Sequence, residues 1–162
     1  MCPAVRSTIL ALAAVIALVV PVGAVTLTST LAVRVVVQPA CTVSGATLDF
    51  GNYPSGQGTA LNGFTQIAYN ACPASQLRFQ LDGGTNGTTA ARRLANGSGG
   101  LLNYAIYRDS ARTQRFGQGT DARVVTPPAS GTGTVSVYGQ IPAGQSVAAG
   151  TYTDTVVITL DF

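Results

Sequence analysis

Four residue types that carry much of enzyme chemistry are missing from this 162-residue chain: histidine, lysine, glutamate and tryptophan. Without histidine there is no Ser-His-Asp triad, no Cys-His pair and no imidazole metal ligand. Without lysine there is no Schiff base and no P-loop. An enzyme would have to work with Asp, Ser, Thr, Tyr and Arg alone. We therefore expect a protein that is not an enzyme and that has no cofactor and no metal site.

Charge is also scarce, since charged residues make up 9% of the chain against about 25% in a typical soluble domain. The net charge of +3 comes from nine arginines that stand scattered and form no basic run, so we expect no nucleic-acid partner. Hydrophobic residues reach 46%, which argues against intrinsic disorder. The chain is rich in glycine (19) and threonine (20), a pairing typical of pleated strands joined by tight turns. The composition predicts an all-β domain.

The first segment has the features of a secretory signal peptide. Arg6 precedes an uncharged apolar run over residues 8–20, which Pro21 ends and which is too short to span a bilayer. Small residues follow, and we predict cleavage after Ala24, so that residues 1–24 are removed on export. The alternative is an uncleaved membrane anchor, against which three threonines between residues 26 and 30 argue.

The cysteines are consistent with export. Cys2 lies before the apolar run and would leave with the signal peptide. Cys41 and Cys72 remain, and an even pair in an exported chain predicts one disulfide. Closing a loop of 31 residues stabilises by roughly 3 to 4 kcal/mol in the chain-entropy model. A metal site would need further thiols or histidine.

Residues 25–37 alternate between apolar and mostly polar positions, the pattern of a long strand with one apolar face. Such a length exceeds the usual five or six residues. The segment is either an ordinary first strand of a complete domain or an extension that pairs elsewhere. The odd, apolar face carries Val25, Leu27, Ser29, Leu31, Val33, Val35 and Val37.

The remainder of the chain, residues 38–162, reads as one domain of short strands with turn signals between them. About seven or eight strands at such spacing point to an Ig-like β-sandwich. The predicted strands are Leu48–Gly51, Phe64–Asn70, Leu77–Leu81, Leu101–Arg108, Arg123–Thr126, Thr134–Ile141 and Thr151–Phe162.

Several stretches together resemble the spore coat protein U family, which includes the subunits of archaic (Csu-type) chaperone-usher pili. The resemblance covers essentially the whole mature chain, and no single motif carries it. One departure is Phe116-Gly117, where relatives often have Trp-Gly. The matching stretches are Cys41-Thr42-Val43 with Leu48 to Tyr53, Ile67 to Cys72, Leu81 to Gly84, Arg92 to Leu94, Leu102 to Asp109, Val137 to Pro142, and Gly150 to Phe162.

The resemblance implies an incomplete Ig-like β-sandwich of about seven strands, whose missing final strand leaves a hydrophobic groove. It implies that a periplasmic chaperone fills the groove first, and that an outer-membrane usher replaces the chaperone with the N-terminal extension of the next subunit. The strand that ends at Phe162 is then the last one, and residues 25–37 are the donor-strand extension. The subunit-to-subunit contacts fall on Val25, Leu27, Leu31, Val33 and Val35.

The first hypothesis is therefore an exported subunit that polymerises with identical or related pilin subunits into a surface pilus or coat, with roles in adhesion and biofilm formation. The alternative is a monomeric secreted β-sandwich that binds glycan or another surface ligand. The two differ in solubility, because an open sheet edge aggregates without a chaperone. A glycosidase would need two carboxylates in one cleft, for which Asp109 and Asp121 are the pair to test.

The cleavage prediction can be checked directly. Exported protein is expected to begin at Val25, because a signal peptidase reads the small residues that end at Ala24. Intact mass should lack the first 24 residues, including Cys2. A full-length mass in a washed inner-membrane fraction would support the membrane anchor instead.

Overall fold

The computed structural model describes residues 23–37, 40–73 and 75–162, so the predicted signal peptide lies, except for its last two residues, outside the described part. The chain divides into two units, one up to Val36 and one from Val37 to Phe162. In the first unit, the described residues form no helix or strand and are exposed. The predicted strand over residues 25–37 is therefore not found in the single chain. A strand needs a partner for its backbone groups, and none is paired with it here.

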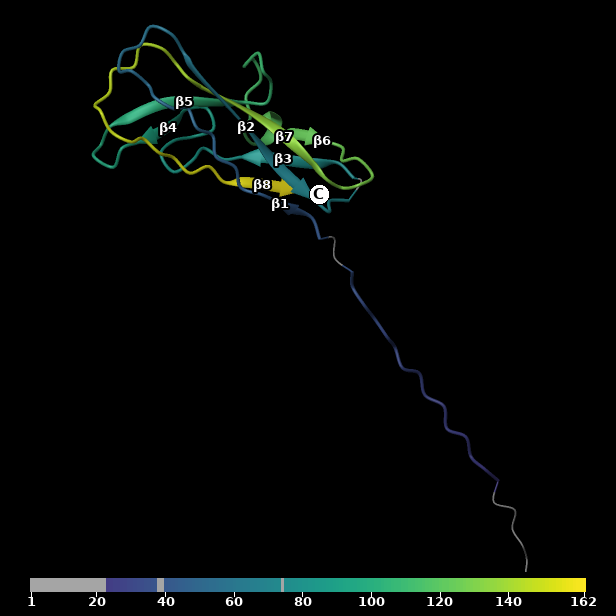
Figure 1. Ribbon diagram of the computed structural model, residues 1–162. Coiled ribbons are helices and arrows are strands. Elements are labelled where there is room, and N and C mark those ends of the chain that lie inside the picture. Colours follow the sequence, from purple (N-terminus) through teal and green to yellow (C-terminus); the bar gives the residue numbers. More distant parts are fainter. Residues whose placement is uncertain (1–22, 38–39, 74) are drawn as a thin grey trace, which may run out of the picture. The chain divides into compact units, whose positions relative to one another are not determined.

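The second unit consists of two antiparallel sheets (Figure 1), which confirms the predicted all-β sandwich. One sheet has the order β1-β2-β7-β5-β4 and the other has the order β6-β3-β8. A short 3₁₀ helix, Gly119–Asp121, precedes β6. The strands are β1 (Thr42–Val43), β2 (Leu61–Asn70), β3 (Leu77–Leu81), β4 (Arg92–Ala95), β5 (Leu101–Tyr107), β6 (Arg123–Val125), β7 (Gly133–Ile141) and β8 (Ile158–Asp161).

The core lies between the two sheets and follows from the period-two patterns of the longest strands. β7 pairs along its whole length with residues 61–69 of β2, from Leu61 opposite Ile141 to Tyr69 opposite Gly133. Their inward side chains meet those of β3, whose three alternate residues are almost fully buried. Each such side chain stabilises the fold by roughly 1.5 to 3 kcal/mol. The core includes Ile67, Tyr69, Leu77, Phe79, Leu81, Leu102, Ile106, Phe116, Val135, Val137 and Ile141.

Five of the predicted strands are present, within three residues of their expected ends. Two predictions were wrong: residues 48–51 form no strand, and the predicted strand 151–162 is a strand only over Ile158–Asp161. Residues 46–50 make no backbone hydrogen bond with the described residues, and residues 151–157 are bonded along one edge only. The sequence also did not reveal β1, which is two residues long, or β4, which begins with two arginines.

The expected disulfide is present and joins Cys41 to Cys72. It connects the residue before β1 to the turn that follows β2, and β1 and β2 pair directly beside it. The Cys72 N–H also donates to the Gly131 carbonyl at 3.0 Å. The bridge thus fixes the point where the chain enters the domain.

Arg92 in β4 is fully buried although it is charged. Its Nε and Nη2 donate to the Asp82 carbonyl at 2.9 and 2.6 Å, and Nη2 also reaches the Leu81 carbonyl at 3.1 Å. Burial lowers the pKa of the guanidinium, and the neighbouring Tyr104 and Asp82 act in the opposite direction. The side chain therefore holds the end of β3 against β4 through backbone acceptors.

A pair of glycines in the long sheet makes room for a segment that belongs to no strand. Gly63 in β2 lies opposite Gly139 in β7. A Cβ atom at Gly139 would lie 2.6 Å from Cζ of Phe50 and 2.7 Å from Cδ2 of Leu48. Leu48 and Phe50 can therefore pack on the sheet only because position 139 is a glycine. Their packing holds residues 46–50 against the inner face of the sheet.

We expect Gly139→Val to displace Phe50 and Leu48, since overpacking of this kind costs about 1 to 3 kcal/mol. The matched control is Gly58→Ala, where a new Cβ meets nothing within 4 Å. Urea unfolding of the exported protein should show a lower free energy of unfolding for Gly139→Val and little change for Gly58→Ala. An unchanged unfolding curve for Gly139→Val would mean that segment 46–50 is not seated on this glycine.

Candidate functional site: an open groove between two unpaired segments

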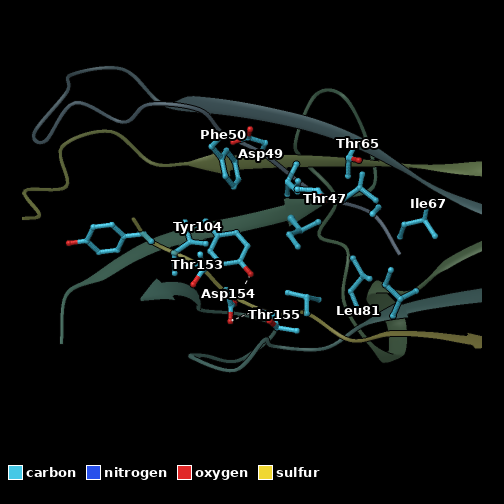
Figure 2. A pocket seen from close by; sticks show the side chains of 18 of the residues that line it. Thr47, Asp49, Phe50, Thr65, Ile67, Leu81, Tyr104, Thr153, Asp154 and Thr155 are labelled. Atoms are coloured by element: carbon cyan, nitrogen blue, oxygen red, sulfur yellow. Dashed lines mark hydrogen bonds between the residues drawn. The ribbon is translucent and has the colours of Figure 1, made fainter. Parts of the chain in front are cut away.

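A groove runs between residues 46–55 on one side and residues 147–158 on the other. It consists of two hollows of about 550 and 580 Å³ that share residues 48–50, Leu94, Thr151 and Tyr152, and are therefore continuous. Figure 2 shows the first hollow, with Asp49 and Phe50 on one side and Thr153 to Thr155 across from them. Both hollows reach side chains of the core.

The floor of the groove is the hydrophobic core itself. The first hollow is lined by apolar side chains from β2, β3, β5, β7 and β8, and the second reaches β5 and the end of β7. The rings of Phe50 and Tyr104 meet edge to face at 6.2 Å across the middle. Six of the eight floor residues are 2 to 4% exposed, and Leu94 and Ile158 are half-buried, so the hollows reach the core without exposing much of it. The apolar floor residues are Ile67, Leu81, Leu94, Leu102, Ile106, Val137, Ile141 and Ile158.

One wall of the groove, residues 151–157, has an unpaired backbone edge. Thr153 exchanges two backbone hydrogen bonds of 2.9 Å with Ala95, and the Val157 carbonyl accepts from the Asp82 N–H at 3.2 Å. The Val157 N–H donates to Oδ1 of Asp82 at 2.9 Å. Among the described residues, no backbone hydrogen bond involves Tyr152, Asp154 or Val156. Alternate residues thus offer their N–H and C=O groups to the groove side.

The opposite wall is unpaired as well. The Ser44 N–H donates to the Ala68 carbonyl at 2.9 Å, and this ends the pairing that begins with β1. From Ala46 to Phe50, the described structure contains no backbone hydrogen bond. Leu48 and Phe50 are half-buried, and buried or half-buried backbone groups are almost always paired in a finished fold. The groove therefore has an apolar floor and two free backbone edges, which suit one more strand.

Asp154 is the polar centre of the groove. Its Oδ2 accepts the Tyr104 hydroxyl at 2.7 Å, as the dashed line in Figure 2 shows. Its Oδ1 accepts the N–H and the hydroxyl of Thr85 at 2.9 and 2.8 Å and the side-chain amide of Asn86 at 3.2 Å. Burial and the hydrogen bond to Asp154 raise the pKa of Tyr104, so its hydroxyl stays protonated and donating. The carboxylate thereby fixes residues 151–157 to β5 and to the loop after β3.

The residues that sequence reasoning assigned to subunit contacts all lie in the first unit and are exposed. The exposed fractions range from 81% for Val35 to 92% for Leu27. The other residues of that set, Val25, Leu31 and Val33, lie between these values. Their role requires a second molecule and stays a prediction. The groove residues were missed individually, although alternate half-burial at Tyr152, Asp154, Val156, Ile158 and Leu160 follows the period-two pattern of the last predicted strand.

The carboxylate pair proposed for a glycosidase does not line the groove. Asp109 accepts the N–H groups of Thr113 and Gln114 and the Thr113 hydroxyl, so it caps a turn. Desolvation opposes the shift and is outweighed by these donors, which lower the pKa of Asp109 and keep it ionised. A general acid needs the opposite shift. Asp121 lies in the 3₁₀ helix, where its N–H donates to Gln118.

Within residues 23–37, 40–73 and 75–162, no group of three or more Cys or Asp side chains is arranged to hold a metal ion. Within the same ranges, no helix has the length and apolarity needed to cross a membrane.

Known proteins resemble the chain over most of its length. The model of the Spore Coat Protein U domain family matches residues 27–159. Protein U of Myxococcus xanthus is 34% identical over 180 aligned positions, which cover 98% of this chain and 99% of that protein.

A crystal structure of the CsuC–CsuE chaperone–tip adhesion subunit pre-assembly complex, from the archaic chaperone-usher Csu pili of Acinetobacter baumannii, contains a similar fold. The TM-score is 0.54 at 20% sequence identity, and the match covers 78% of this chain. It covers 40% of that chain, so this protein spans about two fifths of its length. On the family match over residues 27–159 and the identity with Protein U, the chain belongs to the Spore Coat Protein U domain family.

Proposed function

We propose that the protein is an exported structural subunit that polymerises head to tail into a surface pilus or coat, with the extension of one copy filling the groove of the next. The observation that carries the proposal is the groove with two unpaired backbone edges, together with an apolar, alternating segment that has no strand partner in the single chain. The groove has room for another strand. The extension has the alternating pattern of a strand but pairs with none of the described residues. A contact of this kind does not close on itself, so its product is a fibre.

The extension is long enough to fill the groove. Alternate half-buried residues of the wall, Tyr152, Asp154, Val156 and Ile158, line the first hollow, whereas residues 149–150 form a bend that lines the second. At about 3.3 Å per residue, the span from Tyr152 to Ile158 measures roughly 20 Å and the span from Val25 to Val35 roughly 33 Å. The remainder of the extension is available for the second hollow.

The chemistry of the two parts also agrees. The extension offers five valines and leucines to an apolar floor, and its backbone offers N–H and C=O groups to two free edges. Fully buried Val or Leu contributes roughly 1.5 to 3 kcal/mol, which gives a gross sum on the order of 10 kcal/mol before ordering costs. The subunit-to-subunit residues are Val25, Leu27, Leu31, Val33 and Val35.

The same groove explains the need for other partners. Free backbone edges beside an apolar groove aggregate unless they are covered. A periplasmic chaperone that lends a strand, and an outer-membrane usher that exchanges it for the next extension, fit this need. The similar fold in a chaperone–tip adhesion subunit complex supports these partners. Export with cleavage after Ala24 brings the extension to the mature N-terminus, and the polymer would serve adhesion or biofilm formation at the cell surface.

The alternative is a monomeric secreted sandwich that binds a surface ligand. It requires a groove that the chain closes for itself. The open backbone edges at residues 46–50 and 151–157 argue against a closed monomer, since a monomer would leave them permanently unpaired. Family membership and the absent catalytic residue types favour a structural protein over an enzyme.

Leu31→Asp is expected to abolish surface polymer while leaving the complex with the chaperone intact. The substitution places a carboxylate without a partner in an apolar groove, whereas the chaperone binds the groove and not the extension. The matched control is Thr30→Asp, whose side chain points to the other face of the strand and should be tolerated better. Each variant is co-expressed with chaperone and usher, and both the chaperone complex and the surface polymer are measured.

Two outcomes would contradict donor-strand exchange through the odd face of the extension. If Leu31→Asp prevents the domain from folding, residues 25–37 belong to the subunit's own core. If Leu31→Asp and Thr30→Asp reduce polymer equally, the odd face of the extension is not the face that enters the groove.

A further inference from the structure

The odd face of the extension, residues 25–35, carries one polar residue, Ser29. On the groove wall, alternate half-buried residues run from Tyr152 to Ile158, and Asp154 is the one carboxylate among them. Tyr152 is the other polar residue of this face, and its hydroxyl is already engaged with the Ala148 carbonyl and the Asn96 side-chain amide. We propose that Ser29 of one subunit lies opposite Asp154 of the next and thereby sets the register of the donor strand. The inference rests on the proposed function.

Asp154 has the capacity to accept this hydroxyl. Its Oδ1 is crowded, because the Thr85 N–H, the Thr85 hydroxyl, the Asn86 amide and the Thr155 N–H all donate to it. Its Oδ2 accepts one donor among the described residues, the Tyr104 hydroxyl at 2.7 Å. A carboxylate oxygen accepts two hydrogen bonds. One acceptor position on Oδ2 therefore remains, on a side chain that lines the first hollow.

The residue of the extension that lies opposite Asp154 matters, because the apolar residues of the same face cannot donate a hydrogen bond. A leucine or valine placed against Asp154 would cover the carboxylate without donating to it, and an unmet acceptor in an apolar site costs free energy. A serine hydroxyl donates to it and is small enough to lie beside the Tyr104 ring. Hydrogen bonds to a charged acceptor are about twice as strong as neutral ones. The single serine thus distinguishes one register from those displaced by two residues.

The number of apolar residues on each side of Ser29 fixes the strand direction. Two odd residues precede Ser29, namely Val25 and Leu27. On the wall, two groove-lining residues of the same face follow Asp154, namely Val156 and Ile158. In an antiparallel arrangement, Leu27 lies opposite Val156 and Val25 lies opposite Ile158. The remaining residues of the extension, 31–35, are then available for the second hollow.

The antiparallel arrangement uses the whole groove. Leu31 falls opposite Tyr152, and Val33 and Val35 then reach the second hollow, which residues 147–152 line. A parallel strand with the same serine contact would put Val35 opposite Leu160. Leu160 lines neither hollow, and the second hollow would stay largely empty. The groove therefore fits an extension that runs antiparallel to residues 152–158.

Intermolecular disulfide formation reports the register in the full-length exported chain. Three double variants are compared under mild oxidation: Leu27→Cys with Val156→Cys for the proposed register, Leu27→Cys with Ile158→Cys for a slip of two residues, and Leu31→Cys with Val156→Cys for a parallel strand. Single-cysteine variants are the controls. Products are separated on non-reducing gels, where a head-to-tail link gives a ladder and a link within one chain gives a monomer. All three variants leave Asp154 and its partners unchanged.

The proposed register requires a ladder from the first pair at least tenfold stronger than from the other two. Ser29→Ala should raise the slipped pair relative to the first by about tenfold, since the hydrogen bond that separates the registers is lost. Ser29→Thr keeps the hydroxyl and should keep the register. If the slipped or the parallel pair dominates, or if Ser29→Ala changes nothing, the register inference is wrong while donor-strand exchange stands. If surface polymer forms and no pair gives a ladder, the proposed function itself fails.

Discussion

The unpaired backbone of residues 151–157 is the constraint on which the site depends. A strand in the middle of a sheet has neighbours on both sides, and this segment has one side only: Ala95 and Asp82 take the backbone groups of Thr153 and Val157. The intervening residues turn their backbone groups to the groove. The edge can therefore pair with one further strand, and the described residues of the chain do not supply it.

A lone edge would lose its extended shape without support, and two carboxylates provide that support. Asp82 accepts the Val157 N–H, and Asp154 connects the middle of the segment to Tyr104 and Thr85. Gly84 allows the close approach, because a Cβ there would lie within 2.1 Å of Oδ2 of Asp154. The backbone of Gly84 also has a φ of +75°, which glycine adopts without strain. Side-chain hydrogen bonds thus hold the edge in place where a neighbouring strand would otherwise do so.

The sequence predicted the long strands well because their patterns are local. Alternation over β2, β3 and β7 appears directly in the residues, and so does the cysteine pair of an exported chain. The groove was harder to predict, since it is defined by pairing that is absent. Leu48 and Phe50 alternate like a strand, but whether they pair depends on what lies beside them. Leu48 and Phe50 pack where Gly63 of β2 lies opposite Gly139 of β7. That pairing depends on how the two strands align, which the residue pattern of a single strand does not show.

In a head-to-tail polymer, the disulfide would also have a mechanical role that follows from its place. Tension along the fibre enters each domain where the extension joins it, close to Cys41. The bond to Cys72 passes that tension to the turn after β2, whose strand pairs with β7 over nine residue pairs. Without the bridge, the same tension would act on β1 alone, which is two residues long and pairs only at Thr42 and Val43. Because strand pairs at the end of a sheet open one at a time, a two-residue strand would be peeled away before the groove released its donor.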